Sequence, residues 1–367
     1  MYVFRKISKT ETSFIKGVAM LFIVFHNFSH AIPPWKGENE FGFSFQNTSS
    51  FLQLLSDKPS DFVRLFFAFF GHYGVELFFF ISGYGLFLSY VNKKIRWVDF
   101  VKNHLIKLYP TYLLAICFYF LLYPLRFQQF PDLTHLKIAA LDLFFLQNFF
   151  PGHYPFKLIG PWWFFSVIFQ FYILFPLIMK LFHRYGIKIV ILMGLLSFAL
   201  VFSLSTWIFE NWDYTFFQFF IGWLPVFCLG ILFAWLSEFK LPLWLIILSF
   251  CLVILGNLNI YFWYFVPVAV TIFLLSAIRK LMPLTAKNER IFSIVTWTGK
   301  NSLFIFAFHP MLRHPFVMGA LKYNSPVLTI LLGLVFIFVS LLAAWMVKKV
   351  ENKIQKRFIQ PYLAKRN

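Results

Sequence analysis

FIKGVAMLFIVFHNFSHAI, residues 14–32, decides the fold of this chain. It is the first long apolar run, and a helix of about 20 apolar residues is long enough to cross a lipid bilayer. The same run carries His26 and His30. A charge at mid-bilayer costs roughly 2.5 kcal/mol or more, and neutral polar groups there still need partners. Both histidines are therefore candidate functional residues, and we expect other parts of the chain to supply their partners.

The rest of the chain repeats this pattern. Of its 367 residues, 60% are hydrophobic and only 13% are charged, whereas a soluble domain averages about 25% charged residues. Apolar runs near 20 residues in length recur from end to end, as is typical of a polytopic helical membrane protein. We therefore predict an all-α fold, a transmembrane helical bundle that forms one domain over residues 1–367. The predicted spans are 14–32, 65–91, 105–125, 162–182, 188–206, 215–236, 242–258, 261–279, 292–312 and 326–347.

A further apolar run, 138–150, is too short for an ordinary span. As a helix it would reach only about 20 Å of the roughly 30 Å hydrocarbon core. If it does not span, the basic loop at 180–188 lies on the same side as Arg5, Lys6 and Lys9, as expected for cytoplasmic segments. We therefore predict about ten spans with both termini cytoplasmic, and 138–150 as a re-entrant or interfacial segment.

The formal net charge is +19, which in a soluble protein would suggest nucleic-acid binding. In a membrane protein, basic residues at helix ends orient the chain and meet lipid headgroups, so we predict no nucleic-acid partner. Part of the positive charge could instead receive an anionic cofactor from the cytoplasm. Cys117, Cys228 and Cys251 lie inside apolar runs. We expect free thiols there, with neither a disulfide framework nor a metal site.

One carboxylate lies at a predicted depth similar to that of His26. Glu76 is the only acid of the second span, roughly 15 Å from its outer end. Beside an imidazole it could ionise and orient the ring, which makes the histidine a general base for a hydroxyl group. Alternatively, Glu76 only fixes its helix and His26 is a packing residue. Ser82, further along, sits among small residues that allow close helix packing or leave a narrow passage for a ligand.

Basic residues collect at the cytoplasmic end of the third span. Residues 97–113 carry Lys102, His104 and Lys107, and Lys16 lies near the inner surface in the first span. Basic side chains at this level suit phosphate groups as well as lipid headgroups. Both alternatives remain open from the residues alone.

Four residues are candidate contacts for a substrate. His30 lies one turn beyond His26 on the same helix face. Trp162 fits an outer aromatic belt, and His309 lies near the outer interface, which is open to polar molecules. Tyr172 lies deeper, where an unpaired polar group is costly, so it either bonds to neighbouring helices or contacts a substrate.

Five stretches of the chain form a recognisable set. They are Lys16-Gly17 followed by an apolar run to His26; Gly74-Val75-Glu76-Leu77-Phe78-Phe79 leading to Ser82-Gly83; a basic stretch ending in Leu108-Tyr109-Pro110; Pro161-Trp162-Trp163 through Tyr172 to Pro176; and Gly299, Ser302 and His309. In this order they resemble the acyltransferase-3 family of integral membrane acyltransferases. The resemblance covers roughly residues 14–312, and its first two pieces together are fairly specific.

The resemblance implies an enzyme that takes an acyl group, usually acetyl, from a cytoplasmic acyl-CoA. It would pass that group to a hydroxyl of a carbohydrate at the outer side of the bacterial cytoplasmic membrane. His26 matches the catalytic histidine, Glu76 an acidic position usually held by aspartate, and Lys16 the basic residue before the glycine. His104 and Lys107 fall where arginines are common, which keeps donors but loses bidentate phosphate geometry.

The hypothesis from sequence is thus a membrane O-acyltransferase with acetyl-CoA or another acyl-CoA as donor. Its phosphates bind near Lys16, Lys102 and Lys107. His26, oriented by Glu76, deprotonates the acceptor hydroxyl or briefly carries the acyl group itself. A thioester is already activated, so no metal is expected. The alternative is a transporter or flippase for a glycan or a lipid-linked sugar.

Overall fold

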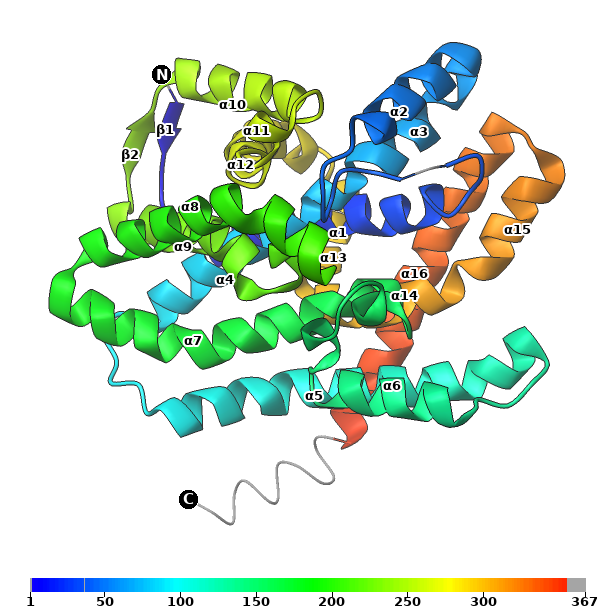
Figure 1. The fold of residues 1–367 in the computed structure, drawn as a ribbon, viewed down its shortest axis with the longest axis horizontal. Helices are drawn as coiled ribbons and strands as arrows, with labels where there is room; N and C mark the ends of the chain where they lie inside the picture. The colour runs from blue at the N-terminus through cyan, green and yellow to red at the C-terminus, as the bar shows by residue number, and fades with distance from the viewer. Residues whose placement is uncertain (1, 36, 355–367) are drawn as a thin grey trace.

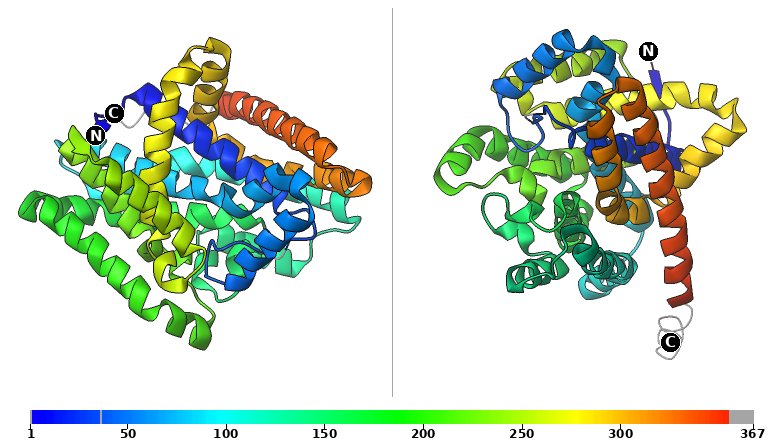
Figure 2. Two further views of the ribbon diagram at one scale, coloured as in Figure 1. Left: turned by 90° about the horizontal axis from the view of Figure 1, so that it is seen from above. Right: turned by 90° about the vertical axis from the view of Figure 1, so that its right-hand side faces the viewer.

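The computed structural model describes residues 2–35 and 37–354, which form a bundle of helices (Figure 1). The strands within these ranges are β1, Tyr2–Phe4, and β2, Phe239–Leu241, and they pair antiparallel. Two further views show α1, Lys9–Ser29, running through the bundle with other helices on both of its sides (Figure 2). The predicted all-α membrane bundle is confirmed.

Turns and loops of different lengths join the helices along the chain. The other α-helices are α2 Phe45–Asp57, α3 Phe62–Phe70, α4 Gly74–Tyr90, α5 Trp97–Phe127, α6 Leu133–Leu143, α7 Trp163–Tyr185, α8 Ile187–Trp212, α9 Phe220–Leu236, α10 Leu243–Gly256, α11 Ile260–Trp263, α12 Val266–Ala286, α13 Glu289–Lys300, α14 Ser302–Leu312, α15 His314–Tyr323 and α16 Pro326–Ile354. The 3-10 turns are η1 Pro59–Asp61, η2 Gly71–Tyr73, η3 Gln147–Phe149, η4 Tyr154–Phe156, η5 Gly160–Trp162 and η6 Phe216–Gln218.

Each predicted span coincides with helix in the structure, although not every one is a long straight helix. Among the described residues, 7 helices are long and apolar enough to cross a membrane, or up to 8 if a bent pair counts as one span. That pair is α13 and α14, which meet at an angle of 87° within the predicted span 292–312. The predicted spans 215–236 and 242–258 correspond to the shorter apolar helices α9 and α10. In the region predicted not to span, α6 has only 11 residues.

α1 begins at a capping box and packs closely against α13. The Ser8 hydroxyl accepts a hydrogen bond from the Glu11 amide, and the Glu11 carboxylate accepts one from the Ser8 amide. A Cβ on Gly17 would collide with the backbone carbonyl of Val295, and a Cβ on Gly299 would collide with that of Ser13. The two backbones therefore approach through paired glycines, as is common between membrane helices.

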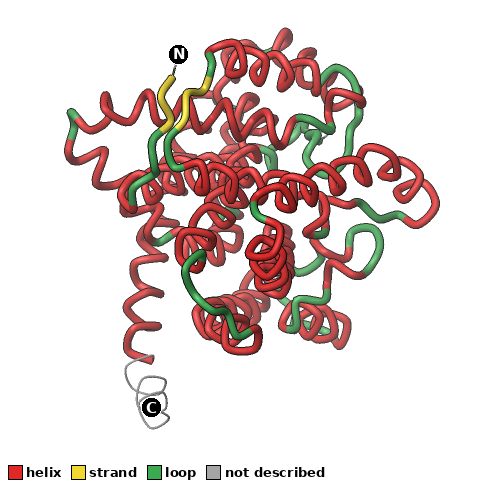
Figure 3. The backbone as a smooth tube through the Cα atoms, turned by 90° about the vertical axis from the view of Figure 1, so that its left-hand side faces the viewer, coloured by secondary structure: helices red, strands yellow, loops and turns green. Residues whose placement is uncertain are grey.

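Three distant segments lie on the same side of the bundle. The two paired strands bring residues 2–4 beside residues 239–241 (Figure 3). Arg279, near the end of α12, donates a 3.1 Å hydrogen bond to Glu11. The topology predicted from loop charges places these three segments on one side, and these contacts agree with that relative arrangement.

Candidate functional site

A cavity of about 650 Å³, here called the histidine cavity, lies at the C-terminal end of α1. Its polar lining includes His26, His30, Glu38, Glu40, Asn47, His72, His153, Asp213, Gln218 and Arg313. Its aromatic lining comprises Phe41, Phe156, Trp163, Phe209 and Phe306. Aromatic walls with a few polar groups are typical of a site for a small ligand.

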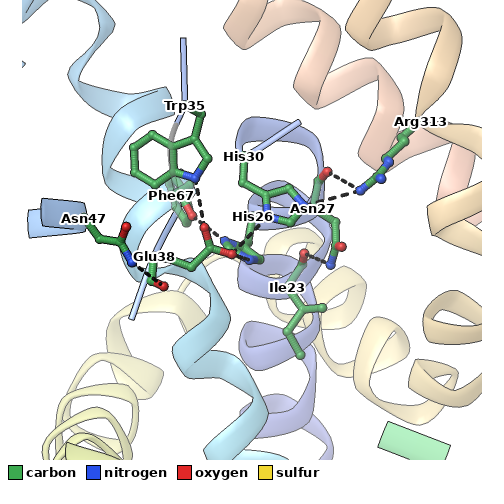
Figure 4. A network of polar contacts seen from close by, with 9 residues as sticks. All are labelled: Ile23, His26, Asn27, His30, Trp35, Glu38, Asn47, Phe67 and Arg313. Atoms are coloured by element: carbon green, nitrogen blue, oxygen red, sulfur yellow. Dashed lines mark hydrogen bonds and ion pairs between the residues drawn. The ribbon is translucent and has the colours of Figure 1, made fainter. Parts of the chain in front are cut away.

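Glu38 lies between two histidines of this cavity (Figure 4). Its Oε1 is 3.1 Å from Nδ1 of His30 and 3.5 Å from Nε2 of His26. Its Oε2 accepts a hydrogen bond of 2.9 Å from the indole nitrogen of Trp35. The carboxylate can therefore balance a positive charge on either imidazole.

The backbone around Glu38 is held by side chains from other elements. Asn47, in α2, donates a hydrogen bond of 3.1 Å to the Glu38 carbonyl. Trp263, in α11, donates one of 2.8 Å to the carbonyl of Asn39. Residues 37–44, although irregular, are thus held in place where Glu38 and Glu40 line the cavity.

A backbone carbonyl orients the ring of His26. Nδ1 lies 3.0 Å from the carbonyl oxygen of Phe67, in α3, so Nδ1 carries the hydrogen and donates it. In the neutral ring, Nε2 then holds the free electron pair and is on the Glu38 side. His26 can accept a proton at Nε2, and Glu38 would stabilise the imidazolium that results.

Three of these residues form a group that could hold a metal ion. His26, His30 and Glu38 each offer one ligand atom, and these atoms lie within 4.8 Å of one another. However, Nη1 of Arg313 lies 3.4 Å from Nε2 of His30 and donates to it (Figure 4). Nδ1 of His30 must then carry the hydrogen that bonds Glu38, so it has no electron pair for a cation. The hydrogen bonds therefore favour a proton-handling cluster over a metal centre.

The two carboxyl groups of this loop differ in charge. Burial alone would raise the pKa of Glu38, but hydrogen bonds from the protonated ring of His26 and from His30 hold that pKa well below its usual range. Burial raises the pKa of Glu40 to about 8. Near neutral pH, Glu38 is therefore ionised and Glu40 is mostly protonated. The negative charge of this loop thus lies on Glu38, beside the two histidines.

A second cavity, of about 550 Å³ and here called the lysine cavity, lies toward the N-terminal end of α1. It is lined by α1, α4, α5, α7 and α14, and its polar residues include Thr12, Lys16, Ser82, Ser89, Lys93, His104, Lys107, Tyr172 and Ser302. Phe306 lines both cavities. Its ring centroid lies 5.1 Å from that of Phe164 and 5.4 Å from that of Phe165. At this point an aromatic side chain separates the two spaces.

The residues predicted to bind the cofactor mostly come together. Lys16, Ser82 and Lys107 all line the lysine cavity. Lys102 is exposed and lines neither this cavity nor the histidine cavity. Tyr172, predicted as a substrate contact, lies in the lysine cavity as well. Its ring centroid lies 4.6 Å from that of His104, with the two planes inclined by 41°.

Glu76 does not contact His26 as predicted. It is buried, it does not line the histidine cavity, and its Oε2 has no hydrogen-bond partner among the described residues. The carboxylate at His26 is Glu38, and the ring is oriented by the carbonyl of Phe67. The structure thus places Glu38, rather than Glu76, beside the ring of His26. A catalytic role of Glu76 stays a prediction.

Two predicted substrate contacts are packed into the bundle. The Trp162 ring is buried, and its nitrogen donates a 3.1 Å hydrogen bond to the carbonyl of Ala307. Trp163 lines the histidine cavity in its place. His309 is buried too, and it lines neither cavity. Its Nδ1 donates a hydrogen bond of 2.9 Å to the carbonyl of Ile305. His30, by contrast, is in the cavity wall as predicted.

Sequence reasoning missed Glu38, Arg313 and His72. Glu38 lies in a polar connection between two predicted spans, where an acidic side chain does not by itself indicate a functional site. Arg313 did carry a signal, because it is a basic residue on the predicted outer side and so breaks the charge rule. His72 lies in an apolar run, two residues before α4 begins at Gly74. A histidine in such a run is a candidate functional residue for the same reason as His26, because a polar group inside a membrane needs a partner.

The comparisons with known proteins gave one match. A family model described as an acyltransferase domain matches residues 12–348, nearly the whole chain. No curated protein and no solved structure matches the chain.

Proposed function

The chain belongs to the acyltransferase domain family, and on this premise we propose which group it moves and between which partners. It is a membrane acyltransferase. We infer that the donor is a cytoplasmic acyl-CoA, most simply acetyl-CoA, and that the acceptor is a hydroxyl of a cell-surface or exported carbohydrate. The observation that carries this proposal is that a basic cavity and a cavity with a histidine–glutamate pair meet at Phe306.

The two cavities suit reactants that arrive from opposite sides. Thr12 and Lys16 lie in the first turns of α1, whereas His26 lies near its other end. Ten residues of helix separate Lys16 from His26 by about 15 Å. We propose that the lysine cavity opens to the cytoplasm of a bacterium and the histidine cavity to the outer side, with both termini cytoplasmic.

The transfer step follows from the contacts of His26. An acceptor hydroxyl gives its proton to Nε2, and its oxygen forms a bond to the acyl carbon of the thioester. The carbon–sulfur bond breaks, and the sulfur leaves with its electron pair and takes the proton from the imidazolium. Glu38 stabilises the charged ring between these events.

The aromatic wall of the histidine cavity supports a carbohydrate acceptor. The Phe41 ring lies 4.9 Å from the ring of Trp163 and 4.9 Å from that of Phe156. Asp213 and Gln218 add polar groups to the same cavity. Apolar ring faces beside a few hydrogen-bonding groups suit a sugar, which has both kinds of surface.

Replacing Glu38 with glutamine is expected to slow acyl transfer while the protein stays folded. The amide keeps the size of the side chain but cannot balance the charge on His26. A hydrogen bond to a charged group is worth about 1.5–3 kcal/mol, which corresponds to roughly a 10- to 150-fold lower kcat. Turnover of purified Glu38→Gln and Glu76→Gln in detergent would be measured together. A normal kcat for Glu38→Gln would contradict the assignment of Glu38 as the charge partner.

Removing the positive charges of the lysine cavity is expected to weaken donor binding. In the Lys16→Gln, Lys107→Gln double variant, we expect KM for acyl-CoA to rise about tenfold, with kcat little changed, because contacts to donor phosphates are lost. Lys102→Gln is the comparison, since that side chain lies outside the cavity and should leave KM unchanged. The opposite order of effects would place the phosphates along the exposed face of α5 instead.

One experiment tests the function itself. Purified protein in sealed vesicles would receive acetyl-CoA on one side and carbohydrate from the cell surface on the other. We expect release of the free thiol of CoA together with acetyl ester on the carbohydrate. Movement of sugar across the vesicle with no thiol released would identify a transporter and overturn the proposal. Mass spectrometry of surface sugars, with and without the protein, would then name the acceptor.

A further inference from the structure

His72 is a buried imidazole without a hydrogen-bond partner. The residue is 2% exposed, and neither Nδ1 nor Nε2 has a partner among the described residues. Folded proteins rarely leave a buried polar group unpaired, because the lost hydrogen bonds to water are not replaced. His72 nevertheless lines the histidine cavity. Its ring is therefore available to a molecule that enters that cavity.

Close packing of the backbone holds this ring beside His26. The two ring centroids lie 5.6 Å apart, with the planes inclined by 66°. His72 is in η2, and a Cβ on the preceding Gly71 would lie only 2.6 Å from the Cβ of His26. The turn is thus pressed directly against α1. Two imidazoles border the same cavity, one held by Phe67 and Glu38 and the other with its hydrogen-bonding capacity unused.

The surroundings of His72 favour the uncharged ring. No acidic group among the described residues forms an ion pair with it, and a buried charge without a partner is very costly. A neutral imidazole has one N–H donor and one acceptor nitrogen. It therefore differs in function from His26, whose Nε2 lies beside a carboxylate and is suited to taking up a proton.

We propose that His72 is a second catalytic residue, which donates a hydrogen bond to the carbonyl oxygen of the acyl group. This inference rests on the proposed acyl transfer. When the acceptor oxygen bonds to the acyl carbon, the carbonyl electron pair moves onto its oxygen, and that oxygen becomes negatively charged. The charge returns to the carbonyl as the carbon–sulfur bond breaks. A fixed N–H aimed at this oxygen binds the transition state better than the ground state, and one such donor is typically worth about 10²–10³ in kcat.

The test is the split between kcat and KM in the His72→Ala variant. We expect kcat to fall by about 10²–10³, as for loss of one oxyanion donor, while KM for acyl-CoA and for the acceptor stays within about threefold. The variant loses only the packing of the ring, such as its contact with Tyr73, because no side-chain hydrogen bond of His72 is broken, so a modest fall in melting temperature is expected. His72→Asn, which keeps a donor, should recover part of kcat and also serves as the folded variant if the alanine variant fails to fold. His314→Ala, an exposed histidine outside both cavities, is the matched control.

Three outcomes would overturn the inference. They are an unchanged kcat, a fall that appears only as a higher KM, or an asparagine variant no better than alanine. These outcomes are distinct from failure of the proposed function, which would show as wild-type protein that transfers no acyl group at all.

Discussion

A His26→Ala variant is expected to fold normally and to lose acyl transfer almost completely. General acid–base catalysis by a positioned side chain contributes about 10²–10⁴ in rate, and in the proposed mechanism the same group takes the proton from the acceptor and returns it to the leaving sulfur. Loss of the ring also leaves Glu38 with His30 as its remaining histidine contact. The measurement is ester formation and thiol release by purified variant protein, compared with wild type at saturating acyl-CoA.

The control for this experiment separates catalysis from folding. His314→Ala removes an exposed imidazole near the start of α15 and should keep wild-type turnover. The elution profile and melting temperature of His26→Ala should match those of wild type. Transfer at the wild-type rate by a folded His26→Ala protein would remove this residue from the chemistry, and with it the proton path through Nε2.

The second large effect concerns folding rather than chemistry. A Gly299→Val variant is expected to lose most of its folded protein, because the new side chain would enter the backbone of α1 at Ser13 and Gly17. Overpacking typically costs about 1–3 kcal/mol, and we expect the upper end here because the obstructing atoms are backbone and cannot rotate away. The measurement is the yield of monodisperse protein from membranes, together with its melting temperature.

A matched glycine provides the control for that variant. Gly85 is also helical, but a Cβ at Gly85 would meet nothing within 4 Å. Gly85→Val should therefore give a normal yield of folded protein, even though the side chain borders the lysine cavity. Equal yields from the two variants would contradict the close contact between α1 and α13.

Residues in periodic apolar segments were predictable from the sequence. The bundle follows from apolar runs of membrane length, and His26 stood out because an ionisable group there is expensive. Lys16 and Lys107 come from different helices, yet the helix directions and loop charges already placed both near the inner surface. The structure gathers them in one cavity. The depth of a residue in the membrane can therefore be predicted from the sequence.

Residues in irregular segments were not predictable in the same way. Glu38 reaches His26 because the backbone of Glu38 and Asn39 is held beside α1 by Asn47 and Trp263. Such contacts depend on the path of an irregular loop, and no periodicity encodes that path. Glu76 was preferred from sequence because it shares a predicted depth with His26. Depth alone does not say which way a side chain faces around a helix axis, and this is the information that the structure adds.

Phe306 also bears on the permeability of the membrane. Because its ring lines both cavities, the two spaces are separated at this place by a single side chain. A continuous aqueous channel here would let protons and metabolites leak down their gradients. With this ring between two cavities that open to opposite sides, as proposed, the acyl-CoA would stay inside while only its acyl group changes sides. Under that proposal, an acceptor outside would be acylated without export of the thioester.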